Sequence, residues 1–319
     1  MLARLQQFTT LGGLFAALLW SWMAWTAGRP GWAVAGAALI VGGYALVLAL
    51  EFALLRLAHG SDPTPRATPS QVLRAWWGEV RSAPVVFCWR QPFRSRRWPD
   101  HLPAAAQGRR GLLLVHGFVC NRGLWNRWLQ RLHEQGTPFV AVNLEPVFGS
   151  IDDYIALLEQ AMQQLERCTG VAPVIVAHSM GGLALRRWWV EQGDDARVHH
   201  AVTIGTPHRG TWLARFAMTR NARQMRLLSG WLQTLAAREP AAVNGPGLEA
   251  GDPVDGVHAN RFRGQRTARV GVFNRNAQAV RVRLRAGVAA QVAAAGREGH
   301  EPGASEGQVV RVRGAVRDR

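Results

Sequence analysis

The sequence contains no lysine, so all 38 of its Lys-or-Arg positions are arginine; with 21 acidic residues the formal net charge is +17. A charge this basic is compatible with nucleic acid or with an anionic membrane surface as a partner. No basic run is interleaved with aromatic residues and no nucleic-acid-binding motif is present, which argues against nucleic acid. The preference for Arg, Ala and Gly along the whole chain is better explained by a GC-rich genome.

Cysteine is also scarce: the chain has only Cys88, Cys120 and Cys168. An odd number of widely spaced cysteines predicts neither a disulfide framework nor a metal site. The three thiols are compatible with a reducing compartment.

The last quarter of the chain lacks many residue types. From residue 241 onward there is no Trp, Tyr, Ile, Met or Cys, and the segment holds 13 Arg against 7 acids. So few large apolar side chains cannot build a core. We interpret residues 241–319 as an irregular or disordered tail rich in Arg, Gly, Ala and Val. The abrupt change favours a shifted reading frame over a natural basic tail.

Two long uncharged stretches, residues 9–27 and 31–50, dominate the N-terminus. Each is long enough to cross a hydrocarbon core of about 30 Å as a helix. Gly28-Arg29-Pro30-Gly31 between them suits a tight turn. We therefore expect residues 1–58 to form two transmembrane helices. The alternative, a cleaved signal peptide, is disfavoured by the weak positive start and the immediate second span.

Arginines predict the orientation of this hairpin. Only Arg29 lies in the turn, whereas four follow the second span: Arg56, Arg66, Arg74 and Arg81. The positive-inside rule then places the main domain in the cytoplasm, on a protein of the inner (cytoplasmic) membrane. Three prolines between residues 59 and 70 predict a linker, which we extend over 59–80.

Residues 81–240 alternate between short apolar runs and segments of helical periodicity. Buried parallel strands read as almost wholly apolar runs, and their alternation with helices predicts an α/β fold with a mostly parallel sheet and helices on both faces. The expected strands are residues 111–116, 138–144, 173–178 and 198–205, with 85–89 as a further candidate; the expected helices are 123–133, 151–168 and one beginning at 182.

The segment Ala177-His178-Ser179-Met180-Gly181-Gly182 follows one expected strand and opens a helix. A serine on such a sharp turn exposes its hydroxyl at the end of the sheet, and the turn needs small residues two positions before and after it. Ala177 and Gly181 meet that need. The positive end of the helix favours a developing anion. We therefore predict Ser179 as a nucleophile rather than as an ordinary helix cap.

A second motif, His116-Gly117-Phe118, directly follows the strand at 111–116. With this motif the chain resembles the lipase and esterase branch of the α/β-hydrolase superfamily, over residues 111–238. The resemblance implies that the amides of Phe118 and Met180 form an oxyanion hole and that His116 is structural. It also implies that the segment Gly205-Thr206-Pro207-His208 shapes the site wall.

The family order requires an acid and then a histidine after Ser179. Asp252 or Asp255, with His258 or His300, are the available residues, and no strand precedes any of them. Neither the acid nor the base is therefore assigned, and residues 81–240 are expected to be an incomplete domain.

These observations predict a membrane-anchored serine hydrolase that cleaves lipid or acyl esters through an acyl-enzyme on Ser179, with no metal or organic cofactor. Two alternatives remain open. One is a catalytically incompetent membrane protein of the same fold, and the other is an acyltransferase or thioesterase. Substrate chain length and oligomeric state stay undetermined.

Overall fold

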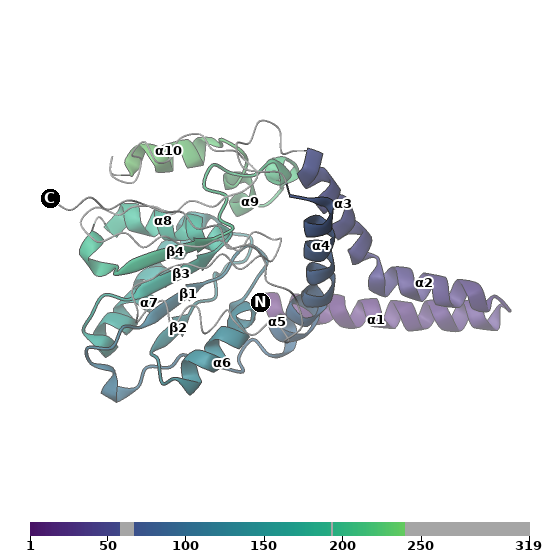
Figure 1. The fold of residues 1–319 in the computed structure, drawn as a ribbon, viewed down its shortest axis with the longest axis horizontal. Helices are drawn as coiled ribbons and strands as arrows, with labels where there is room; N and C mark the ends of the chain where they lie inside the picture. The colour runs from purple at the N-terminus through teal and green to yellow at the C-terminus, as the bar shows by residue number, and fades with distance from the viewer. Residues whose placement is uncertain (58–66, 193, 240–319) are drawn as a thin grey trace.

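The computed structural model describes residues 1–57, 67–192 and 194–239. Within them a sheet of four parallel strands has the order β2-β1-β3-β4 (Figure 1). The strands are β1 (Leu112–Val115), β2 (Phe139–Ala141), β3 (Val174–His178) and β4 (His200–Ile204). This arrangement confirms the predicted parallel sheet, and each strand lies within its expected range.

The central strands β1 and β3 are buried because both sheet faces are covered. Every residue of β1 is at most 1% exposed, and Leu114 lies opposite Ala141 on one side and Val176 on the other. Alternate residues of β1 belong to two separate hydrophobic clusters. The uninterrupted Leu-Leu-Leu-Val run is therefore apolar because each face needs its own apolar side chains.

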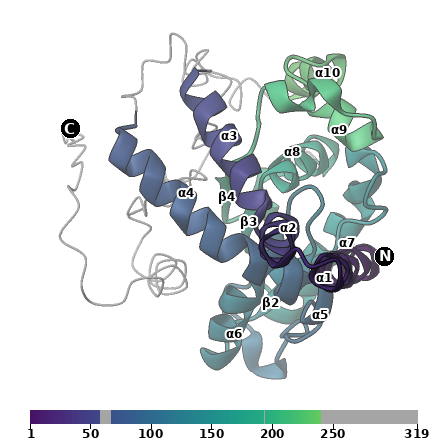
Figure 2. The same ribbon diagram turned by 90° about the vertical axis from the view of Figure 1, so that its right-hand side faces the viewer.

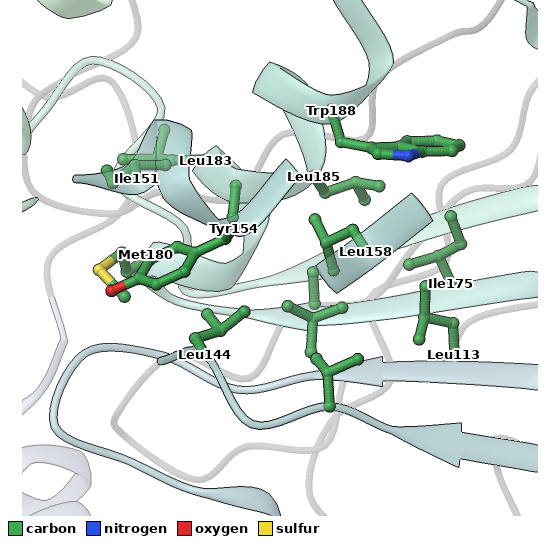
Figure 3. Close-up of a cluster of buried hydrophobic side chains, with 14 of the residues drawn as sticks. Leu113, Leu144, Ile151, Tyr154, Leu158, Ile175, Met180, Leu183, Leu185 and Trp188 are labelled. Carbon is green, nitrogen blue, oxygen red and sulfur yellow. The ribbon is translucent and has the colours of Figure 1, made fainter. Parts of the chain in front are cut away.

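Helices on the two faces complete these clusters. On one face, Leu112 and Leu114 pack with residues of α6 (Asn126–Glu134). On the other, Leu113 packs with α7 (Ile155–Thr169) and α8 (Met180–Gln192), whose contributions include Leu158 and Trp188 (Figure 3). Helices on both faces were predicted from the alternation of apolar runs and are confirmed.

After β4 the chain forms η6 (Trp212–Phe216), α9 (Arg220–Gln224) and α10 (Gly230–Arg238). Helix α10 packs beside α8 at the top of Figure 1. The remaining short helices are η2 (Ala104–Ala106), η3 (Arg122–Trp125), η4 (Ile151–Tyr154) and η5 (Asp195–Arg197). The expected tail, residues 241–319, lies outside the described residues.

The N-terminal helices α1 (Leu2–Thr26) and α2 (Pro30–Gly42) form a hairpin that projects from the domain (Figures 1 and 2). Helix α1 is long and apolar enough to cross a membrane. The second expected span is not one straight helix, because α2 and α3 (Tyr44–Leu57) are bent by 53° at Gly43. Among the described residues, one helix, or two if the bent pair counts as one, has the length and composition of a span.

The structure differs from the expectations for residues 59–80 and for residues 85–89. Residues 69–80, expected in the linker, belong to α4 (Pro69–Ala83), which begins with a reciprocal capping box between Thr68 and Gln71. Residues 85–89, a candidate strand, lie in the π-helix η1 (Pro84–Arg90), which leads into α5 (Gln91–Phe93). Pro84 keeps helical backbone angles (φ −62°, ψ −39°), so the helical backbone continues from α4 into η1.

Candidate active site

Ser179 occupies the single residue between β3 and α8, at the carboxyl end of the sheet. Its φ is +52°, in the left-handed region that residues with a Cβ rarely adopt. Such strain persists only where the surroundings enforce it, and it is typical of functional sites. The structure thus places the predicted nucleophile on the sharp strand-to-helix turn, half-buried at the edge of the core.

Three hydrogen bonds hold the turn. The Ser179 N–H donates to the carbonyl of Ile204, at the end of β4, over 2.8 Å. The Ser179 carbonyl accepts from the Gly182 N–H at 3.0 Å and from the Thr206 hydroxyl at 2.9 Å. Thr206 is fully buried. The Gly-Thr-Pro-His segment, expected as a site wall, therefore also fixes the backbone of the predicted nucleophile, a role that sequence reasoning missed.

Two glycines let neighbouring backbones approach the turn. A Cβ added to Gly117 would lie 2.8 Å from the Ser179 Cβ, and one added to Gly181 would lie 2.4 Å from the His116 carbonyl oxygen. Real Cβ atoms do not approach other atoms so closely. The loop after β1 therefore touches the nucleophile turn directly, and a larger side chain at either glycine would push the two apart.

The loop after β1 carries the first predicted oxyanion donor. Phe118 follows Gly117, and its ring meets that of Phe148 edge-on at 6.1 Å. Val119, next along the chain, has a φ of +50°. A β-branched residue in this region is strained. The second predicted donor, Met180, is the first residue of α8, where backbone N–H groups have no acceptor within the helix.

His116 is buried beneath this loop. Its Nε2 accepts a hydrogen bond from the Leu144 N–H at 3.0 Å, so its proton lies on Nδ1, which donates to the Gly117 carbonyl at 2.8 Å. Burial lowers the pKa of His116 to about 4, against a smaller opposite effect of the Gly117 hydrogen bond. The imidazole of His116 is therefore neutral, and both of its ring nitrogens bind backbone groups of neighbouring residues, as expected of a structural histidine.

His208 is likewise engaged in the fold. Its side chain is buried, and its Nε2 lies 3.2 Å from the Thr203 hydroxyl on β4. Its carbonyl accepts from the Arg186 guanidinium at 2.8 Å. These contacts are compatible with the expected role of this segment in the site wall.

Among the described residues, two acids from outside α8 pair with its arginines. Glu239 binds Arg186 through both carboxylate oxygens at 2.6 and 2.8 Å, with its side chain 3% exposed. Asp152 binds Arg187 at 2.8 Å and accepts from Trp231. Burial alone would raise the pKa of Asp152, but hydrogen bonds from Ser150, Arg187 and Trp231 outweigh it and lower that pKa. Both carboxylates therefore stabilise the packing around α8.

The candidate acids, Asp252 and Asp255, and the candidate bases, His258 and His300, all lie outside the described residues. The described residues contain no group of three or more His, Cys, Asp or Glu side chains arranged to hold a metal ion.

The solved structures that resemble the chain include two lipases and a phospholipase. Lipase BlEst2 of Bacillus licheniformis in its mature form is 18% identical, and the match covers 44% of this chain and 63% of that one (TM-score 0.38). Phospholipase PlaB from Legionella pneumophila is 16% identical, and the match covers 41% of this chain and 35% of that one (TM-score 0.36). Lipase B from Aspergillus fumigatus is 18% identical, and the match covers 45% of this chain and 38% of that one (TM-score 0.37). The chain spans less than two thirds of each of these proteins.

No curated protein matches the chain. The model of the alpha/beta hydrolase family matches residues 112–313, more than half of the chain. The match begins at β1 and includes the nucleophile turn, the loop after β1 and the Gly-Thr-Pro-His segment. The chain belongs to the alpha/beta hydrolase family.

Proposed function

We propose that the chain is a membrane-anchored serine hydrolase that cleaves lipid or acyl esters through an acyl-enzyme on Ser179. The observation that carries the proposal is the backbone of Ser179, strained at φ +52° between β3 and α8. This geometry presents a hydroxyl at the carboxyl edge of the sheet, in front of the first turn of a helix. Family membership and the resemblance to lipases support the same reaction class.

In the proposed mechanism the Ser179 hydroxyl attacks the ester carbonyl while a histidine takes its proton. The tetrahedral oxyanion accepts hydrogen bonds from the amides of Phe118 and Met180, and the positive end of α8 adds to their field. Collapse expels the alcohol, which takes the proton from the histidine. Water then attacks the acyl-enzyme by the same route. Neither the histidine nor its acid partner is assigned among the described residues.

Membrane anchoring is supported by the surface of the hairpin. Large apolar side chains of α1 are exposed, including Phe8, Leu18 and Trp22 at 66–77%. Exposed apolar surface on this scale marks a site of membrane or protein interaction. A lipid or long-chain acyl ester is the substrate class that such an anchor would bring to the site, with the catalytic domain on the cytoplasmic side.

The test is covalent labelling of the detergent-extracted full chain with a fluorophosphonate. We expect the wild type to label, Ser179→Ala to lose labelling, and Ser82→Ala, which removes an exposed serine of α4, to label like the wild type. Hydrolysis of p-nitrophenyl esters from acetate to palmitate then gives the preferred acyl length. A folded wild-type protein that does not label contradicts the proposal and favours the incompetent alternative.

A further inference from the structure

Three buried amide side chains join the start of α1 to the catalytic domain. Gln6, Gln91 and Asn121 are 8%, 0% and 6% exposed. The Gln6 Nε2 donates to the Gln91 Oε1 over 3.1 Å, and the Asn121 Nδ2 donates to the Gln6 Oε1 over 3.4 Å. Gln6 is a polar residue buried near the start of a helix most of whose large apolar side chains are exposed, so its role lies in this contact.

The amide cluster holds the loop that carries Phe118. Gln6 Nε2 lies 3.5 Å from the Val119 carbonyl oxygen, a long hydrogen bond. The Asn121 N–H donates to Gln91 Oε1 at 3.1 Å, and the Asn121 Nδ2 donates to the Gln91 carbonyl at 2.9 Å. Asn121 in turn caps η3 by accepting from the Gly123 N–H at 2.9 Å. The loop is therefore fixed at Val119 and again at Asn121.

This loop needs such support because its conformation is strained. Val119 has a φ of +50°, and a β-branched side chain resists that backbone. Phe118, whose N–H is the proposed oxyanion donor, immediately precedes it. Relaxation of Val119 would rotate the peptide that joins these two residues and disturb the direction of the neighbouring Phe118 N–H.

We propose that Gln6 is a positioning residue for the reaction: by binding Gln91, Asn121 and the Val119 carbonyl, it keeps the Phe118 amide directed at the oxyanion. The inference rests on the proposed function of Ser179. The hairpin thereby has a second role besides anchoring, since its first turns complete the support of the active site. Substrate binding away from the oxyanion does not depend on this contact.

Gln7 provides a matched control. Its Nε2 donates to the Pro92 carbonyl at 2.7 Å, so it also joins α1 to α5, but this hydrogen bond does not reach residues 116–121. Gln6→Met and Gln7→Met each keep the side-chain length and remove the amide. Both variants are measured as full chains in detergent for kcat and KM on a soluble ester, for the rate of fluorophosphonate labelling, for thermal midpoint and for hydrogen exchange of residues 117–121.

We expect Gln6→Met to lower kcat and the maximal labelling rate by roughly tenfold, with KM within twofold, because a displaced oxyanion donor weakens transition-state binding. Its loop amides exchange faster, and Gln7→Met stays within twofold of the wild type. A Gln6→Met protein with wild-type rates and exchange overturns the inference. Equal losses in both variants, with equal falls in thermal midpoint, overturn it too, because they report general docking of α1.

A wild-type protein that does not label contradicts the proposed function instead. The exchange measurement then still tests the support of the loop: unchanged exchange in Gln6→Met refutes it independently of any activity.

Discussion

The Thr206 hydroxyl donates a 2.9 Å hydrogen bond to the backbone carbonyl of Ser179. Thr206 comes two residues after β4, and Ser179 directly follows β3, so the bond links the ends of two neighbouring strands. It ties the orientation of the nucleophile turn to a segment that no sequence argument had assigned to the turn.

Replacing Thr206 with Val keeps its shape and removes this bond. We expect unfolding free energy to fall by about 1 kcal/mol, since the Ser179 carbonyl keeps its bond from Gly182. Ester hydrolysis should fall more than stability explains, because the turn gains freedom. Thr169→Val, which removes a buried hydroxyl that bonds to the Leu165 carbonyl and to the backbone of Val171, is the control. Urea unfolding and kcat are measured for both, and equal kcat values would refute a role for Thr206 in the turn.

Gly181→Ala tests the contact between the nucleophile turn and the loop after β1. The new Cβ would lie 2.4 Å from the His116 carbonyl oxygen and 2.9 Å from that of Val115, both rigid backbone atoms. We expect a loss of stability of about 1–3 kcal/mol from overpacking, together with a loss of fluorophosphonate labelling. A Cβ added to Gly78 in α4 would meet nothing within 4 Å, so Gly78→Ala should preserve both stability and labelling. Chemical denaturation and the labelling assay check these two expectations.

Stability should depend on pH through His116. Its pKa is lowered to about 4 in the folded chain, whereas an unfolded histidine titrates near 6.5. The unfolded state therefore binds the proton first as pH falls. The stabilisation is complete above about pH 6.5 and declines toward pH 4, with a slope of at most about 1.4 kcal/mol per pH unit.

His116→Gln keeps an acceptor for the Leu144 N–H and does not titrate, so it should flatten that dependence. Urea unfolding at pH 7, 6 and 5 measures the slope for each protein. Identical slopes in wild type and variant would show that other groups dominate.

The buried ion pair between Arg186 and Glu239 should stabilise the fold strongly, compared with a variant in which only one of the two charges remains. Glu239→Gln leaves the Arg186 charge at 10% exposure with a neutral partner, and we expect a loss of about 3 kcal/mol. Glu191→Gln, which removes an exposed partner of Arg187, should leave the unfolding free energy nearly unchanged. Thermal unfolding of both variants gives the comparison, and similar midpoints would contradict the expected difference.

The sheet was predictable because burial on both faces leaves a local mark. The Leu-Leu-Leu-Val run of β1 is apolar throughout, and the serine after β3 has small residues two positions before and after it, as a sharp turn demands. Both signals come from residues adjacent in sequence. The helix at α4 also had a local signal, the Thr-Pro-Ser-Gln capping box, which the nearby prolines obscured.

The missed features depend on distant partners. Gln6 and Asn121 are 115 residues apart in the sequence, and Thr206 and Ser179 are 27 residues apart. A glutamine in an apolar helix or a threonine after a strand has no local signature of what it will contact. The bend at Gly43 was missed for the same reason: α3 turns to pack on α4, where the Tyr44 hydroxyl donates to the Val80 carbonyl at 2.7 Å.

That bend sets how deeply the protein would sit in a bilayer. Helix α2 has 13 residues and rises about 20 Å, some 10 Å less than a hydrocarbon core. If Arg29 reaches the far headgroups, the near side of the core extends past Gly43 to the edge of the domain formed by α4 and η1. That edge exposes Trp77, Phe87 and Trp89 at 43–53%. Under the proposed membrane anchoring, this edge of the domain would contact the lipid, and the acyl chain of the proposed substrate would not need to leave the lipid to reach the surface of the domain.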